Sequence, residues 1–329
     1  MAYDGRIMQR ALTRFDEDKQ RRAAQLEQRR RTAYARAPRL AEIETELRGT
    51  MGRIISSALA RGTDPVPAIR VLRDENLQLQ RERAELLASL GYPADYLEEK
   101  PACDTCGDTG YVSGGVCACL RAYYAREQLA ELSRLLPLGE DSFETFSFDW
   151  YDSAVQPAFG ISPRENMERN YDVCRDYAYQ FAKGSGDLLL SGGTGLGKTF
   201  LSACIARVVS ENGFSVVYDT AASVFSRFED AKFRRDDGGS EDADRCMRCD
   251  LLILDDLGTE MTTSFVQSAL YQIVNGRLMA GRSTIISTNL APEEIGSRYG
   301  RSVLSRLEGE YEILPFFGED IRRLKRERQ

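Results

Sequence analysis

The chain has 329 residues, of which 42% are apolar and 29% charged, and its formal net charge is −7. This length allows two domains and a small further module. Histidine is absent, which excludes histidine general bases and histidine metal ligands. No stretch of the sequence approaches a membrane span, and the first residues lack the apolar core of a signal peptide. We therefore expect a cytoplasmic protein whose partners do not include a membrane.

Residues 1–100 are expected to form a helical N-terminal domain that binds a partner. The first third of it is rich in Arg, Gln and Glu, which fits a solvated helix or a partly disordered arm. Apolar residues then recur at helical spacing over 39–60 and over 68–90. Asn76 and Arg83 occupy seam positions of the second helix and argue against a long independent coiled coil. The two helices fit a hairpin that packs on itself and is compatible with a docking surface.

Residues 101–122 form a small module that is rich in cysteine and glycine. Two close pairs of cysteines frame it: Cys103 and Cys106, then Cys117 and Cys119. Four thiolates satisfy tetrahedral Zn²⁺, and the glycines permit tight turns that aim the sulfurs. The second pair is C-x-C rather than C-x-x-C, so unligated thiols or a redox pair remain alternatives. We predict a closed, structural zinc site.

Residues 123–165 are expected to be a linker, made of a helix and an irregular stretch. Helices and strands then alternate over 166–329, which is typical of an α/β domain with a parallel sheet. The expected helices of this domain cover 166–182, 198–210, 221–230 and 263–279. The expected strands cover 187–191, 215–219, 250–254 and 283–287, and a polar loop covers 233–244. A C-terminal tail is expected to follow, with one further strand near 312–316.

The turn after the first of these strands matches the phosphate-binding pattern G-x-x-x-x-G-K-[ST] in full. It consists of Gly192, Gly193, Thr194, Gly195, Leu196, Gly197, Lys198 and Thr199. Glycines let successive backbone N–H groups point at phosphate oxygens, and the next helix presents its positive N-terminus to the same anion. We expect this loop to bind ATP, with Lys198 at the β- and γ-phosphates and Thr199 as a ligand of Mg²⁺.

Two later strands end in polar residues, at the end of a parallel sheet where ligands bind. The apolar run 251–254 is followed by Asp255, which we expect to hold Mg²⁺, and by Asp256, which would orient or activate the attacking water. The strand after it ends at Asn289, whose amide fits between the γ-phosphate and that water. Late arginines that could stabilise charge on the transferred phosphoryl group are Arg301, Arg306, Arg322 and Arg323.

These motifs, in this order, resemble the AAA+ ATPases. The stretches LGTE from Leu257, LYQIVNGR from Leu270 and GRSTIISTNL from Gly281 narrow the resemblance to the DnaC/DnaI helicase loaders and the related IstB transposition helpers. The resemblance covers about residues 100–325. It implies a P-loop AAA+ parallel sheet with helices on both faces, preceded by the α-helical N-terminal domain and the zinc module.

The resemblance also implies roles for single residues. Asn289 would be the sensor-1 residue, Arg306 would supply an arginine finger to a neighbouring subunit, and Arg322 would face the nucleotide. Asp256 stands where many AAA+ proteins carry Glu. The implied activity is therefore a slow ATPase that assembly stimulates.

The preferred interpretation is an ATP-switched loader. Subunits would self-associate through bridging ATP, the N-terminal region would grip the replicative DNA helicase, and the helicase would be placed on single-stranded DNA. One alternative is an IstB-like transposition helper ATPase, although the cysteine module and the long helical N-terminus favour a loader. Another is a nucleotide-dependent adaptor with little hydrolysis. The overall acidity disfavours tight, unassisted DNA binding.

Overall fold

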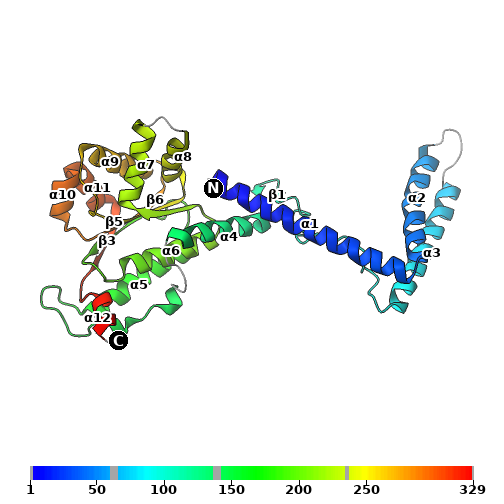
Figure 1. The fold of residues 1–329 in the computed structure, drawn as a ribbon, viewed down its shortest axis with the longest axis horizontal. Coiled ribbons are helices and arrows are strands. Elements are labelled where there is room, and N and C mark those ends of the chain that lie inside the picture. The colour runs from blue at the N-terminus through cyan, green and yellow to red at the C-terminus, as the bar shows by residue number, and fades with distance from the viewer. Residues whose placement is uncertain (1–2, 60–65, 136–141, 234–236, 328–329) are drawn as a thin grey trace. The chain divides into compact units, whose positions relative to one another are not determined.

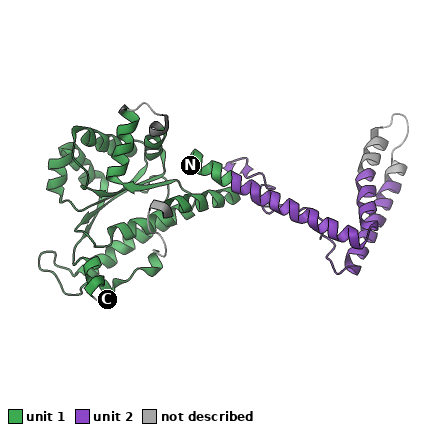
Figure 2. Ribbon diagram, in the orientation of Figure 1, with its two compact units in different colours: residues 1–12, 118–329 green, residues 13–117 purple. Residues whose placement is uncertain are grey.

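The computed structural model describes residues 3–59, 66–135, 142–233 and 237–327. The chain divides into two compact units, one of residues 1–12 and 118–329 and one of residues 13–117 (Figure 2). The helices are α1 Gly5–Arg36, α2 Arg39–Leu59, α3 Val66–Ser89, α4 Ala118–Leu135, α5 Pro163–Tyr179, α6 Lys198–Glu211, α7 Ala221–Phe233, α8 Asp237–Arg248, α9 Ser264–Met279, α10 Pro292–Tyr299, α11 Arg301–Glu310 and α12 Ile321–Glu327. The strands are β1 Tyr111–Val112, β2 Gly115–Val116, β3 Asp187–Gly192, β4 Val216–Thr220, β5 Leu251–Leu257, β6 Ser283–Thr288 and β7 Tyr311–Phe316.

Helices dominate the unit of residues 13–117. The first expected segment is a continuous helix, α1, and α2 and α3 pack as the predicted hairpin. The polar seam residue Arg83 on α3 lies 3.9 Å from the carboxylate of Glu44 on α2, which explains why a charged side chain is tolerated there. Arg39 at the start of α2 donates to both carboxylate oxygens of Glu82 on α3, at 2.9 and 3.2 Å. None of the helices in the described parts of the chain combines the length and the apolar character of a membrane span.

The other unit is built around a five-stranded sheet with the order β4-β5-β6-β3-β7, in which every neighbouring pair is parallel. Helices α5 and α6 lie on one face of the sheet, and α7 and α9 lie on the other (Figure 1). Strand residues alternate between the two faces, as the period of a strand requires. Leu188 and Leu190 pack toward α6, whereas Leu189 packs toward α9. The predicted α/β fold, with a parallel sheet covered on both faces, is confirmed.

Two expectations about this unit are wrong. Most of the stretch predicted as a polar loop over 233–244 belongs to helix α8, and the C-terminal tail contains α10, α11 and α12 besides its strand. The sequence of α8 starts with glycines and acids, which favour a loop. Tertiary contacts outweigh this local preference, because Cys246 is fully buried and Arg245 pairs with Glu131 at 2.7 Å.

Candidate nucleotide site and cysteine cluster

The glycine loop joins the end of β3 to the start of α6 and adopts backbone angles that favour glycine. Gly192, Gly195 and Gly197 have φ of 150°, 70° and 98°. A Cβ atom on Gly192 would lie 1.9 Å from the backbone oxygen of Phe316 on β7. The loop therefore requires glycine at this position for packing as well as for its conformation.

Lys198 begins α6 and turns back across the loop. Its Nζ donates to the carbonyl oxygens of Gly192 at 2.7 Å and Gly193 at 2.6 Å, and the side chain is buried. Burial lowers the pKa of Lys198, while the charges of Asp256 and Asp255 oppose this shift. The ammonium group thus lies at the centre of the loop that the sequence assigns to phosphate.

The two aspartates at the end of β5 sit in a break of the strand register. The pairing of β5 with β6 shifts between Leu254 and Leu257, which is a β-bulge, and Asp256 has φ of 54°. Such a conformation costs on the order of 1 kcal/mol for a residue other than glycine. In a regular strand, neighbouring side chains point to opposite faces. The bulge changes the direction of Asp256, which lines the same cavity as the glycine loop.

Hydrogen bonds hold both aspartates in place. The carboxylate of Asp255 accepts from the hydroxyls of Tyr218, at 2.7 Å, and Ser287. Its Oδ1 also lies 3.4 Å from the hydroxyl of Thr199. The backbone N–H of Asp256 donates to Ser287 Oγ at 2.9 Å. Burial, followed by the charge of Asp255, raises the pKa of Asp256, and Lys198 opposes that shift.

A cavity of about 410 Å³ lies over the glycine loop. Its wall brings together most of the predicted site residues. They are Thr194, Gly195, Leu196, Gly197, Lys198, Thr199, Asp256, Asn289 and Arg322. Asp255 is buried beneath this wall. Its carboxylate lies 3.4 Å from the hydroxyl of Thr199, which lines the cavity. The cavity is large enough for a ligand of nucleotide size.

One wall of this cavity comes from residues that the sequence analysis missed. Phe146, Trp150 and Tyr151 belong to the stretch expected to be a linker, and all three line the cavity. The hydroxyl of Tyr151 donates to the carbonyl oxygen of Leu196 in the glycine loop at 3.0 Å. The density of aromatic residues between 143 and 151 was a signal that could have marked this stretch as part of a site.

The four late arginines lie in different surroundings. Arg322 lines the cavity, whereas Arg306 on α11 does not. The guanidinium of Arg306 lies 5.5 Å from the ring centre of Tyr271 on α9, and its Nη2 donates to the Tyr271 hydroxyl at 3.4 Å. Arg323 pairs with Glu319 and Glu327 on or beside its own helix, each at 3.5 Å. Arg301 is exposed at the start of α11.

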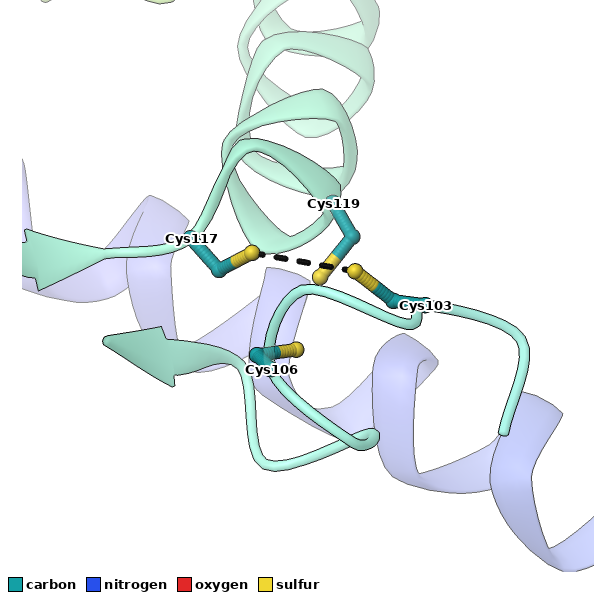
Figure 3. A group of neighbouring side chains, drawn as sticks. All are labelled: Cys103, Cys106, Cys117 and Cys119. Atoms are coloured by element: carbon teal, nitrogen blue, oxygen red, sulfur yellow. Dashed lines mark hydrogen bonds between the residues drawn. The ribbon is translucent and has the colours of Figure 1, made fainter. Parts of the chain in front are cut away.

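The four cysteines of the small module point toward one another (Figure 3). Their Sγ atoms all lie within 4.8 Å of one another, and those of Cys103 and Cys117 are 3.8 Å apart. Sulfurs bound to a tetrahedral zinc ion, each at about 2.3 Å, are about 3.8 Å apart. Asp108 braces the first turn, because its carboxylate accepts from the backbone N–H groups of Ala102 and Cys103, each at 3.0 Å. The cluster is consistent with a zinc module.

The cysteines elsewhere are of a different kind. Cys246 and Cys249 are buried, and the guanidinium of the fully buried Arg277 donates to their backbone oxygens at 2.7 and 3.1 Å. Burial raises the pKa of the Cys246 thiol to about 12. A neutral, buried thiol is a packing group rather than a metal ligand.

A parallel sheet with a glycine loop after β3 and an acidic end on β5 defines a P-loop ATP-binding domain of the AAA+ class. Residues 173–329 match the protein family described as IstB-like ATP binding protein. The chain thus carries an IstB-like AAA+ domain, and this domain is related to the DnaC helicase loaders at about 30% identity.

Two curated relatives illustrate this similarity. The uncharacterized protein YdaV of Escherichia coli K12 is 31% identical over 161 residues, 45% of this chain and 64% of the relative. The replicative helicase loader DnaC of the same strain is 30% identical over 135 residues, 40% of this chain and 54% of the relative. The match therefore spans between about half and two thirds of the length of these relatives. A crystal structure of the DnaC helicase loader covers 55% of this chain and 99% of its own, at 19% identity and a TM-score of 0.46.

Proposed function

We propose that the chain is an ATP-dependent loader of a replicative DNA helicase, with ATP binding and hydrolysis acting as its switch. The observation that carries the nucleotide half of this proposal is the cavity in which the glycine loop, Asp256, Asn289 and Arg322 meet. The helicase half is supported by the similarity to DnaC over the AAA+ domain. Because a loader acts on DNA inside the bacterial cell, the proposal places the chain in the cytoplasm.

The residues at the cavity are proposed to have separate roles in ATP hydrolysis. In this proposal, loop N–H groups and Lys198 bind the β- and γ-phosphates and offset their charge. The hydroxyl of Thr199 and the carboxylate of Asp255 offer hard oxygen ligands 3.4 Å apart, which fits Mg²⁺. When bound, Mg²⁺ would neutralise charge on the phosphate oxygens.

The remaining residues would act on water and on the developing charge. Asp256 accepts a proton from the attacking water, and Asn289 orients that water against the γ-phosphate. Arg322 lies in the same cavity and stabilises negative charge on the phosphates. The aromatic side chains of Phe146 and Trp150 offer an apolar surface for a nucleobase at the far side of the loop.

Arg306 is proposed to act on a neighbouring subunit. It lies on α11, outside the cavity of its own chain, and its guanidinium is held over Tyr271. An arginine that does not reach its own nucleotide can complete the site of another copy only when subunits associate. Hydrolysis would then depend on assembly, which is the behaviour expected of a switch.

The four cysteines are proposed to hold a structural zinc ion. Their mutual distances suit tetrahedral coordination, and all four positions would be filled by protein sulfurs. Such a closed site leaves no position for a substrate. Its role would be to fix the turn that carries Cys103 and Cys106, where the residues bury little apolar surface.

The nucleotide half is tested by titrating ATP and Mg²⁺ into the wild-type chain and into Lys198→Ala, with Lys183→Ala as an exposed control. Removing the ammonium that faces the phosphates should weaken ATP binding by at least about a hundredfold. The control should bind like wild type. Unchanged affinity in Lys198→Ala would sink the assignment of the phosphate site.

A second candidate is an IstB-like transposition helper, and the family match over residues 173–329 favours it. Such a helper would bind duplex DNA and a transposase. Measuring the affinity of the ATP-bound chain for duplex and for single-stranded DNA separates the two. A preference for duplex DNA would favour the transposition helper. ATP binding with no hydrolysis under any condition would instead favour a nucleotide-dependent adaptor.

A further inference from the structure

The hydroxyl of Tyr218 reaches the carboxylate that the proposed function assigns to Mg²⁺. Tyr218 lies on β4 and is 3% exposed. In the parallel pairing of β4 and β5, Tyr218 is opposite Ile253 and Thr220 is opposite Asp255. Residues two apart share a face of a strand, so Tyr218, Ile253 and Asp255 all face α6. The phenol therefore extends diagonally along the sheet, and its hydroxyl donates to Asp255 Oδ2 at 2.7 Å.

Asp255 lies between hydroxyls from both neighbouring strands. Tyr218 on β4 occupies Oδ2, while Ser287 on β6 donates to Oδ1. The hydroxyl of Thr199 lies 3.4 Å from Oδ1. Each carboxylate oxygen has about two lone-pair sites, so Oδ1 keeps one site on the side of Thr199. The bond from Tyr218 thus fixes which oxygen faces Thr199.

Packing alone does not require this hydroxyl. The neighbouring residues of β4, Val216 and Val217, are apolar and buried, and a phenylalanine would fill the same space as Tyr218. A buried hydroxyl needs a hydrogen-bond partner, and most such partners are backbone oxygens. Here the partner is a carboxylate at the nucleotide site, so the hydroxyl acts on Asp255.

We propose that Tyr218 is a positioning residue that turns Oδ1 of Asp255 toward Thr199 and thereby sets the affinity of the nucleotide site for Mg²⁺. The proposal deepens the proposed function and rests on it. The phenol itself does not touch nucleotide or cation. It restricts the rotation of Asp255, so that the cation meets a carboxylate already in its binding orientation.

Tyr218→Phe removes only the hydroxyl and tests this proposal. A fluorescent ATP analogue is titrated into the full chain in EDTA and then at increasing Mg²⁺. In EDTA the variant should bind like wild type, because phosphate contacts are unchanged. The Mg²⁺ concentration that gives half of the metal-dependent gain in ATP affinity should rise at least about tenfold, as expected from losing one hydrogen bond to a charged group. Ser287→Ala should shift it in the same direction.

The matched control is Tyr177→Phe. Its hydroxyl donates to the carbonyl oxygen of Gly186 at 3.1 Å, just before β3 and at the opposite end of that strand from the glycine loop. This control should keep the wild-type Mg²⁺ dependence. If Tyr218→Phe and Ser287→Ala both stay within twofold of wild type, the positioning role is wrong while the proposed nucleotide site stands. If wild type itself fails to bind the analogue with Mg²⁺, the proposed function fails, and this proposal fails with it.

Discussion

Asp255 and Asp256 are neighbours in sequence, yet the bulge in β5 gives them different surroundings. Asp255 is buried and accepts hydrogen bonds from hydroxyls on both adjacent strands. Asp256 is exposed to the cavity, and burial of part of its carboxyl together with the charge of Asp255 raises its pKa. A raised pKa makes a carboxylate a stronger base. This difference supports the assignment of Asp255 to the cation and Asp256 to the attacking water.

We predict that Arg306 acts on the nucleotide site of a neighbouring subunit. Arg306→Ala should bind ATP like wild type but lose at least about tenfold in assembly-dependent hydrolysis, because the missing guanidinium would serve a neighbouring site. Mixing it with Lys198→Ala should restore part of the activity. In the mixture, an intact nucleotide site of one variant meets an intact Arg306 of the other. ATP turnover across a range of mixing ratios measures this.

Arg301→Ala is the control for Arg306, since Arg301 is exposed and begins the same helix. It should leave both assembly and turnover unchanged. The role in trans is contradicted if no mixture of Arg306→Ala with Lys198→Ala exceeds the activity of the separate variants. Loss of turnover in Arg301→Ala instead would move the role to that residue.

The phosphate loop and the aspartates were predictable from sequence, whereas their supports were not. A contiguous motif such as Gly192–Thr199 fixes its own geometry, because strand, loop and helix follow one another. Tyr218, Ser287 and Tyr151 contact the site through pairings that span 37, 32 and 45 residues. Which strand lies beside which is a property of the sheet order, and no local pattern encodes it.

At the scale of elements, the cysteine module depends on turns that bury little apolar surface. β1 and β2 have two residues each, and the turn after Cys106 contains Gly107 and Asp108 with φ of 58° and 57°. Small modules of this kind need a metal or cross-links for stability. Bound zinc would supply that stability.

Cys103→Ser tests this account of the module. The variant should lose most of its bound zinc, and amide hydrogen exchange should increase over residues 101–122, because three sulfurs hold a structural zinc much more weakly than four. Zinc content by elemental analysis and exchange by mass spectrometry measure the two effects. Thr105→Ala, exposed in the same turn, is the control. An equal zinc content in wild type and Cys103→Ser would refute the site.

Regular elements were predicted well where hydrophobic periodicity was strong. The predicted strands over 187–191 and 283–287 match β3 and β6 to within one residue, because each contains a short, buried run of Leu or Ile residues. Helix α8 and the tail helices were missed for the opposite reason. Their sequences are polar, and α8 is held by Cys246 and Arg245, whose partners lie elsewhere in the chain.

At the scale of the whole molecule, the two compact units differ in their structure and in their proposed roles. The unit that contains the sheet carries the ATP-binding domain, and its residues 173–329 match the family described as IstB-like ATP binding protein. The unit of residues 13–117 consists mainly of α1, α2 and α3, and three of the four clustered cysteines lie at its C-terminal end. In the proposed loader, the helices of residues 1–100 would recognise the helicase, and the nucleotide state would control association and release.

The most direct test of the loader is transfer of the helicase onto circular single-stranded DNA. A ring-shaped helicase cannot thread onto a circle without ends, so loading requires a factor that opens the ring or assembles it around the strand. The full chain, ATP and the replicative helicase of the same organism are mixed with the circle, and helicase on DNA is isolated by gel filtration. We predict helicase on the circle with wild type and ATP, and background levels with Lys198→Ala. No helicase on the circle, and no complex between chain and helicase with or without ATP, would contradict the account.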